Sequence, residues 1–328
     1  MSKSYQYPVF VSPCFEQRIW GGRRLESEFG FGIPEGNIGE CWAVSGYPER
    51  ESVAENGPCE GRTLSAFWAA EPDFFGAAQL PDEVRESGYP FITKIIDARE
   101  NLSIQVHPDD AYAAVHENGA KGKTECWYIL DCPDDAYLIL GHNARTKEEF
   151  VQMIEEGQWD ALLRRVPVKR GDFVQLEPGT IHAITAGVML LETQQSSDVT
   201  YRVYDYGRLE NDKPRQLHIQ QSIDVSTVPA PEMDGLVLHT ADAAANRTQE
   251  LVSCKFYRVE KLPVDGNFVM EEKAPFWIAS IVEGEGSVTC SGQTYALKKG
   301  QSFLLPCDYG KAEFSGKMTV ILAAPQGK

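Results

Sequence analysis

Short apolar runs separated by glycine and proline recur along the chain, a pattern typical of a mainly β protein. Within many of these runs apolar and polar residues alternate, so that successive side chains lie on opposite faces of a strand. This pattern predicts strands in the first two thirds of the chain. They include residues 38–46, 89–98, 102–108, 125–132, 136–142, 172–178 and 188–195.

Three helical segments interrupt the predicted strands. The third carries a capping box, in which Thr146 and Glu149 satisfy backbone groups at the first turn. The pattern therefore predicts a β-rich fold with helical insertions. The helices begin at Thr63, at Asp109 or Asp110, and at Thr146, and the last two end at Gly119 and Gly157.

A change in composition marks a domain boundary between about residues 218 and 255. The segment VSTVPAPEMDG is rich in proline and ADAAANRTQE is polar, and short strands return beyond them. We predict a first domain with helical insertions over residues 1–235 and a small β-barrel over residues 236–328. His239 is the last histidine of the chain, so the barrel beyond it is expected to serve structure or assembly.

Two segments share a phrase in which basic residues precede glycine, an apolar strand and proline. They are KRGDFVQLEPGTIHAI at 169–184 and KKGQSFLLPCDYGKAEF at 298–314. The similarity favours two copies of one barrel, of which only the first keeps a functional site. The alternative is that such a phrase recurs in any β protein.

Composition limits the classes of function. The chain has 328 residues and a net charge of −17, and apolar residues make up 42%. A packed core is therefore expected, whereas binding to nucleic acid or anionic membranes is not. A site for a small anion would need a local cluster of Lys and Arg.

The chain lacks the sequence signals of export and of membrane insertion. No apolar run approaches the roughly 20 residues of a membrane helix, and MSKSYQYPVF lacks a signal-peptide core. The eight cysteines form no CxxC pair. We therefore expect a cytoplasmic protein with mostly reduced thiols and no cysteine zinc site.

Polar side chains that suit a metal ion occur at several positions in the first domain. In LSIQVHPDD, Ser103, Gln105 and His107 share one strand face, Glu125 lies about twenty residues further on, and His182 follows a Pro-Gly turn. Two imidazoles, a carboxylate and an amide oxygen suit a borderline divalent metal such as zinc and leave room for water or a substrate oxygen. The alternative is that each histidine is an ordinary hydrogen-bonded residue.

The order of these residues is the ligand layout of a cupin barrel, with G-x6-P-G-x2-H leading to the second histidine. The chain resembles the type I phosphomannose isomerases, especially the short bacterial form. The resemblance extends over nearly the whole chain, and QVHPDD followed by KTE is its most specific part. The matching motifs are IWGGRRL (19–25), IGECWAVSG (38–46), LSIQVHPDD (102–110), GKTECWYIL (122–130), PGTIHAI (178–184) and ETQQSSDVTYRVYDYGR (192–208).

The resemblance implies two cupin-like barrels and a zinc-dependent isomerase that interconverts mannose 6-phosphate and fructose 6-phosphate through an enediol. It implies one Zn²⁺ per subunit, bound by His107, Glu125 and His182 with Gln105 as fourth ligand, and an active-site arginine at Arg202. Longer relatives carry a helical domain between the second and third of these ligands. Here about 56 residues separate them, so that domain is mostly absent and its substrate contacts must be made differently.

The substrate phosphate requires cationic and hydroxyl partners. Arg202 suits a phosphate or a developing enediolate charge, because its guanidinium is planar and multidentate. The family places a serine, here Ser103, at the phosphate end of the pocket, although this residue could be a plain strand hydroxyl. Lys123 is expected on the same face as Glu125. Lys94 could point inward to the phosphate, or instead pair with Asp97 or remain solvated.

The proton transfer requires a general base, for which Glu192 and Asp198 are candidates. Glu192 follows an apolar run, so burial is expected to raise its pKa. It could instead pair with Arg202 or orient a ligand, and the sequence does not choose between the two acids. His116 and His142 are expected on a helix surface and in a turn, without a role in the site.

Two other classes of function fit the same residues. Two histidines and one carboxylate also describe iron oxygenases, and a sugar-binding cupin need not turn over its ligand. Arg202, Lys123 and the amide ligand Gln105 favour the isomerase. A monomer or a weak homo-oligomer is expected, since few signals demand a partner.

Overall fold

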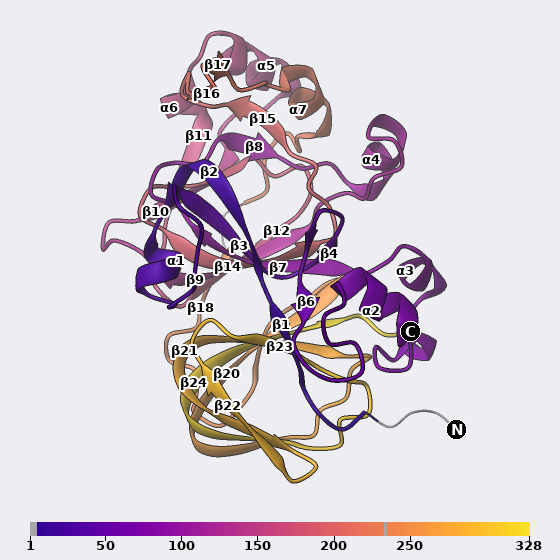
Figure 1. The fold of residues 1–328 in the computed structure, drawn as a ribbon. Helices are drawn as coiled ribbons and strands as arrows, with labels where there is room; N and C mark the ends of the chain where they lie inside the picture. Colours follow the sequence, from indigo (N-terminus) through magenta and orange to yellow (C-terminus); the bar gives the residue numbers. More distant parts are fainter. Residues whose placement is uncertain (1–4, 233–234) are drawn as a thin grey trace.

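The computed structural model describes residues 5–232 and 235–328, and it contains two β bodies, one above the other in Figure 1. Two facing sheets form the upper body and one large, curved sheet forms the lower body. This arrangement confirms the predicted mainly β fold with two barrel-like regions. The upper body contains every metal-ligand candidate of the sequence.

A seven-stranded antiparallel sheet forms one wall of the upper body, in the order β18–β12–β9–β14–β7–β3–β2. Its central strands are apolar on the outer face, and Cys41, Ile95 and Leu191 belong to a cluster that also includes residues of the lower body. The strands are β2 (Cys14–Gly22), β3 (Ile38–Val44), β7 (Phe91–Asp97), β9 (Glu125–Asp131), β12 (Asp172–Leu176), β14 (Met189–Gln195) and β18 (Val237–His239).

The facing wall is a five-stranded antiparallel sheet in the order β11–β10–β13–β8–β15. Alternation along β10 places Leu138 and Leu140 in the core with Trp127, and Ile139 in a second cluster with Phe150. The strands are β8 (Ile104–Val106), β10 (Tyr137–His142), β11 (Leu163–Pro167), β13 (His182–Ile184) and β15 (Tyr201–Tyr204).

Helices lie around the sheets and do not form a layer of their own. Near the top of Figure 1, α5, α6 and α7 lie beside the five-stranded sheet, and Phe150 and Ile154 of α5 pack in its outer cluster. The helices are α1 (Arg24–Ser27), α2 (Leu64–Ala70), the 3-10 helix η1 (Ala77–Gln79), α3 (Asp82–Glu86), α4 (Asp110–His116), α5 (Lys147–Glu155), α6 (Trp159–Leu162) and α7 (Ile219–Val225).

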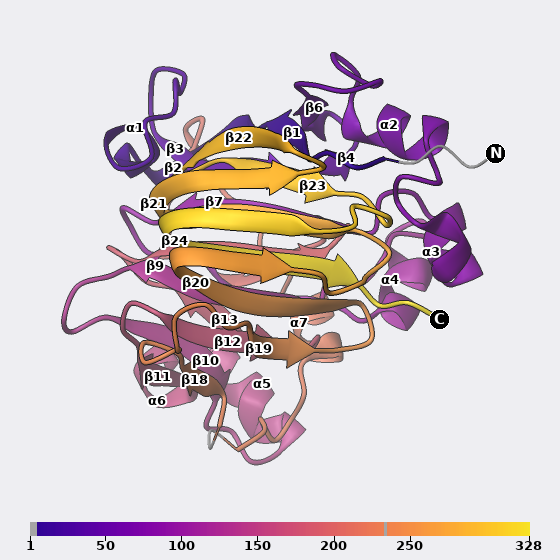
Figure 2. The same cartoon turned by 90° about the horizontal axis from the view of Figure 1, so that it is seen from below.

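The lower body is an eight-stranded sheet whose three long strands run side by side in Figure 2. Its interior is apolar, and Trp277, Phe303 and Phe314 fill it. The strands are β1 (Val9–Ser12), β6 (Val53–Ala54), β19 (Gln249–Ser253), β20 (Tyr257–Met270), β21 (Trp277–Cys290), β22 (Gln293–Lys298), β23 (Ser302–Leu305) and β24 (Ala312–Pro325); β4 (Gly46–Tyr47) with β5 (Arg50–Glu51), and β16 (Leu209–Glu210) with β17 (Lys213–Pro214), form two small hairpins.

The predicted strands of the upper body are all present, each one or two residues shorter at one or both ends than predicted. The helix predicted from Thr63 is capped by that residue but ends at Ala70, before the proline of the same segment. The predicted capping box is only half formed. Thr146 caps α5, but the Glu149 carboxylate accepts from the backbone N–H of Arg145, one residue too early.

Two strands from the first part of the chain, β1 and β6, belong to the lower sheet, where β1 pairs with β23. Strand β18, just after residue 235, instead pairs with β12 in the upper sheet. The division at residues 235 and 236 stays a prediction. So does the duplication of one barrel, although each shared phrase spans a strand, a turn with proline and the start of the next strand.

Candidate active site

Three buried side chains from three strand ends converge between the two upper sheets. His107 follows β8, Glu125 begins β9 and His182 begins β13, and one ligand atom from each lies within 4.8 Å of the others. Glu125 Oε2 is 3.6 Å from His107 Nε2, and Glu125 Oε1 is 3.3 Å from His182 Nε2. The donor set and spacing suit a divalent metal ion bound by two imidazoles and one carboxylate.

Backbone carbonyls fix the orientation of both imidazoles. His107 Nδ1 lies 2.8 Å from the carbonyl oxygen of Val199, and His182 Nδ1 lies 2.9 Å from that of Thr180. A carbonyl only accepts, so each Nδ1 carries the proton and each Nε2 presents its lone pair to Glu125. This is how metal-binding histidines are usually held.

The charges of the cluster also suit a cation. Burial lowers the pKa of both histidines, that of His182 to about 3, so both are neutral ligands. Burial would raise the pKa of Glu125, but the Lys123 ammonium holds it well below its usual range. Apart from the ion pair with Lys123, neither buried oxygen of Glu125 accepts a hydrogen bond from the described residues.

Gln105 lies between the cluster and the rest of the site. On the five-stranded sheet it is paired in register with His182 on one side and Arg202 on the other. Its Nε2 is 3.3 Å from His182 Nε2, and its Oε1 accepts from Ser103 Oγ at 3.3 Å. As a fourth metal ligand, the amide would have to turn over to present its oxygen.

The facing sheet presents a row of four paired residues. Trp42 of β3, Lys94 of β7, Glu192 of β14 and Trp127 of β9 are successive partners across the strands. Lys94 Nζ lies 4.1 Å from the centre of the Trp42 ring and 3.5 Å from Glu192 Oε1, and Trp127 Nε1 donates to Glu192 Oε2 at 3.0 Å. Lys94 therefore does not pair with Asp97, which binds Arg24 instead.

A cavity of about 240 Å³ lies between the sheets, beside the histidine–glutamate cluster. It is lined by seven of the side chains singled out in the sequence, and two of them, Gln105 and Lys123, contact the cluster. The fold therefore brings all ten candidate residues into one region. The seven are Lys94, Ser103, Gln105, Lys123, Glu192, Asp198 and Arg202.

The two candidate bases differ in their surroundings. Burial raises the pKa of Glu192, although Lys123 and Lys94 oppose the shift. Asp198 is about a third exposed, and its carboxylate is bound by the Arg50 guanidinium at 2.6 Å. Glu192 is the less solvated and less firmly paired of the two.

Several lining residues were not anticipated from the sequence, among them Arg18, Glu40, Arg50 and Arg215. Glu40 is bound by Arg18 at 2.9 Å and by Trp42 Nε1 at 2.8 Å. One signal was available, because Glu40 and Trp42 alternate within IGECWAVSG and so share a strand face. Arg50 and Arg215 come from hairpins, for which alternation along a strand gives no signal.

Neither remaining histidine of the prediction belongs to the cluster. His116 is exposed at the end of α4, as expected for a helix surface. The expectation of a turn for His142 is wrong, because it ends β10, is 1% exposed and bonds through Nε2 to the Thr227 carbonyl at 3.0 Å. Its buried Nδ1 has no hydrogen-bond partner among the described residues, so only one ring nitrogen is bonded.

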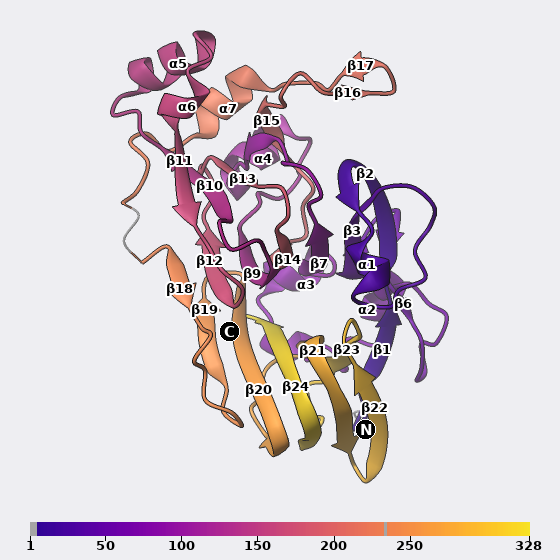
Figure 3. The ribbon, with the colours of Figure 1, turned by 90° about the vertical axis from the view of Figure 1, so that its left-hand side faces the viewer.

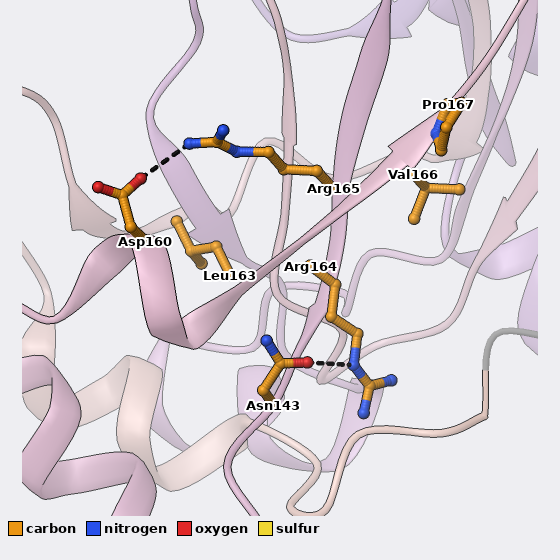
Figure 4. A pocket seen from close by; sticks show the side chains of 7 residues that line it. All are labelled: Asn143, Asp160, Leu163, Arg164, Arg165, Val166 and Pro167. Atoms are coloured by element: carbon orange, nitrogen blue, oxygen red, sulfur yellow. Dashed lines mark hydrogen bonds and ion pairs between the residues drawn. The ribbon is translucent and has the colours of Figure 1, made fainter.

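A larger hollow of about 930 Å³ on the surface lacks such chemistry. Figure 4 shows Arg164 and Arg165 pointing apart within it, one toward Asn143 and the other toward Asp160. Its lining contains no histidine, glutamate or cysteine, so it offers no metal-ligand set. None of the helices in the described residues is long and apolar enough to cross a membrane.

Comparisons with known proteins agree on one family. The model for the catalytic domain of type I phosphomannose isomerases matches residues 9–128, and the model for the cupin domain of mannose-6-phosphate isomerases matches residues 247–325. The chain is 46% identical over 309 residues to the mannose-6-phosphate isomerase ManA of Bacillus subtilis, covering 94% of this chain and 95% of that one.

Two further relatives extend the comparison. A mannose-6-phosphate isomerase of Streptococcus mutans is 42% identical, with 96% of this chain and 97% of that one covered. The crystal structure of a mannose 6-phosphate isomerase from Bacillus subtilis superimposes with a TM-score of 0.87 at 39% identity, covering 97% of this chain and 99% of that one.

Proposed function

The chain belongs to the type I phosphomannose isomerases and its activity is the isomerisation of mannose 6-phosphate, and we propose that turnover depends on one Zn²⁺ held by His107, Glu125 and His182. The observation that carries the proposal is the convergence of two neutral imidazoles on a buried carboxylate that is otherwise paired only with Lys123. Gln105 is the proposed fourth ligand.

Aldose–ketose isomerisation moves a proton between C1 and C2 of the sugar through an enediol. Bound zinc supplies a Lewis acid for the sugar oxygens. The protein must supply a base for the proton, a grip on the phosphate and a site with little water. The small cavity between the two upper sheets is the proposed place of this reaction.

We assign the general base to Glu192. Its Oε2 is held by Trp127, and its buried Oε1 accepts no hydrogen bond from the described residues. A carboxylate that is fixed in place and poorly solvated is a stronger base than one in water. Asp198 is the weaker candidate because Arg50 binds and stabilises its charge.

Arg202 is proposed to bind the substrate phosphate, with Ser103 at the same end of the cavity. Lys123 neutralises Glu125 at 2.6 Å and so stabilises the deprotonated ligand. Lys94 lies with Glu192 and Trp42, and its predicted phosphate contact stays a prediction.

The test is a coupled assay for conversion of mannose 6-phosphate to fructose 6-phosphate, before chelation, after chelation and after return of zinc. We expect activity to disappear with the chelator and to return with zinc. Activity that is unaffected by complete metal removal would contradict the zinc proposal. Activity restored by iron but not by zinc would show that the metal is iron and contradict the zinc proposal.

A variant at Arg202 distinguishes catalysis from sugar binding without turnover. Arg202→Ala should lose turnover and keep its zinc, because the arginine lies outside the metal cluster. Zinc content is measured by elemental analysis of the desalted protein. A sugar-binding protein without turnover would have no activity to lose.

A further inference from the structure

The cationic side chains that line the cavity are not equally free to bind an anion. Arg18 is bound to Glu40 at 2.9 Å, Arg50 to Asp198 at 2.6 Å and Lys123 to Glu125 at 2.6 Å. Lys94 lies 3.5 Å from Glu192. Each of these charges is already largely compensated.

Arg202 differs from this group. Among the described residues, no carboxylate lies within ion-pair distance of its guanidinium, and its buried Nε has no hydrogen-bond partner. Burial and the neighbouring positive charge of Arg215 lower the pKa of Arg202. Arg202 and Arg215 line the same cavity, so their two positive charges act on one another there.

Arg215 is a lining residue whose side chain is 9% exposed. Its closest carboxylate is Asp205, at 3.3 Å, but Asp205 also binds Arg208. Glu210 lies 3.8 Å away with half of its side chain exposed. Asp205, the buried carboxylate of this group, is thus shared by Arg208 and Arg215, whereas Arg202 makes no ion pair among the described residues.

The chain connection explains how Arg215 reaches the cavity. After β15 the chain leaves the sheet, forms the β16–β17 hairpin and returns at His218, and Figure 3 shows the hairpin extending toward the side where β2 lies. Two hydrogen bonds join the two ends of this segment. His218 N donates to the Arg202 carbonyl at 2.8 Å, and Arg202 N donates to His218 Nδ1 at 3.2 Å.

We propose that Arg215 is the second cation of the phosphate grip, acting with Arg202, and that it determines preference for phosphorylated over free sugars. This inference rests on the proposed function, since it names the phosphate contact of that same site. Two guanidinium groups can donate several charge-assisted N–H bonds to the oxygens of one phosphate. They also provide the local positive charge that a chain of net charge −17 needs to attract such a substrate.

The experiment compares Arg215→Gln with Arg208→Gln. Both variants remove one arginine from Asp205, but only Arg215 lines the cavity. Loss of a charge-assisted hydrogen bond to phosphate should raise KM for mannose 6-phosphate about 10- to 100-fold in Arg215→Gln. The same substitution should raise the inhibition constant of inorganic phosphate to a similar extent. The value of kcat should change by less than about threefold.

Two further readouts isolate the phosphate contact. The low rate with unphosphorylated D-mannose should be the same in Arg215→Gln and the native protein, and zinc content should not change. The rise in melting temperature that inorganic phosphate produces in the native protein should be lost in Arg215→Gln and kept in Arg208→Gln. This last measurement needs no turnover, so it tests Arg215 even if the zinc proposal fails.

Three outcomes would overturn the inference. One is an unchanged KM and an unchanged response to phosphate in Arg215→Gln. Another is an equal loss in both variants, which would mean that Asp205 merely needs its partners for local folding. A third is a fall in the rate of Arg215→Gln with D-mannose that is as large as its fall with the phosphorylated sugar.

Discussion

At the residue scale, the metal cluster depends on the protonation of its histidines. The carbonyls of Val199 and Thr180 fix the proton of each ring on Nδ1, and burial keeps both rings neutral. Since a metal ion needs the free lone pair of each Nε2, the site is prepared before any ion binds.

The first prediction concerns His182. His182→Ala should weaken zinc binding more than about 100-fold and abolish isomerase activity, because it removes one of the four proposed protein ligands. Zinc bound after desalting is measured by elemental analysis. His116→Ala is the control, since His116 is exposed on α4. A full equivalent of zinc in His182→Ala would show that the ion binds elsewhere.

The second prediction distinguishes the two acids. Glu192→Gln should lower kcat by about 100-fold or more, because a general base contributes 10²- to 10⁴-fold. Zinc content and KM should change little. Asp198→Asn should lower kcat less, since Asp198 pairs with Arg50 outside the row of Lys94 and Glu192. A larger loss in Asp198→Asn would assign the base to Asp198.

At the element scale, the ends of strands and helices place the ligands. The loop before β9 is tied to the start of α4, where Gly122 N donates to the Asp110 carboxylate at 2.9 Å and Lys123 N to the Pro108 carbonyl at 3.0 Å. The same loop leads directly into Lys123 and Glu125. Its close approach to α4 therefore sets the position of one metal ligand.

The third prediction tests this contact. A Cβ at Gly122 would lie 2.3 Å from the carbonyl carbon of Asp109, so Gly122→Ala must shift backbone. We expect a loss of roughly 1–3 kcal/mol in the free energy of unfolding, together with weaker zinc binding. Urea unfolding and zinc titration measure the two effects.

The control for Gly122→Ala is Gly119→Ala. Gly119 has open space around it but a φ of +85°, so alanine there costs about 1–2 kcal/mol through backbone strain. This variant should lose stability and keep normal zinc affinity. If Gly122→Ala also keeps its zinc affinity, the loop does not position Glu125.

At the scale of the whole molecule, the two β bodies differ in what fills them. Aromatic and aliphatic side chains close the lower interior around Trp277, Phe303 and Phe314. In the upper body, a polar cavity and the metal cluster occupy part of the space between the sheets. The strands β1 and β6 of the lower body tie it to the first part of the chain.

The fourth prediction concerns the pH dependence of stability. Burial raises the pKa of Glu260, on β20, from 4.5 to about 7, Glu272 adds to the shift, and Arg258 opposes it. The folded state therefore holds this proton more tightly than the unfolded chain. The resulting stability is complete below pH 4.5 and is lost as the pH rises through about 7.

Glu260→Gln removes this titration. The free energy of unfolding should therefore fall less between pH 5 and pH 8 in the variant than in the native protein, as urea unfolding at both pH values would show. Glu313→Gln, at an exposed position of β24, should follow the native pH dependence. Parallel curves for Glu260→Gln and the native protein would contradict the prediction.

The sequence by itself determined the strands and the identities of the metal-ligand candidates. Alternation with a period of two placed Gln105 beside His107, and the spacing from Lys123 to Glu125 put an ammonium beside a carboxylate, as the 2.6 Å ion pair shows. These are local consequences of backbone geometry, so they can be read without knowing which strands pair. The same holds for the caps formed by Thr63 and Thr146.

Only the tertiary structure decided which charged groups meet. Lys94 pairs with Glu192 and not with Asp97, Arg50 binds Asp198, and Arg215 reaches the cavity from a hairpin. Such pairs join residues far apart in sequence, and they depend on strand register and on the path of loops. The energies that fix register and loop path are summed over the whole core, so no short stretch of sequence contains them.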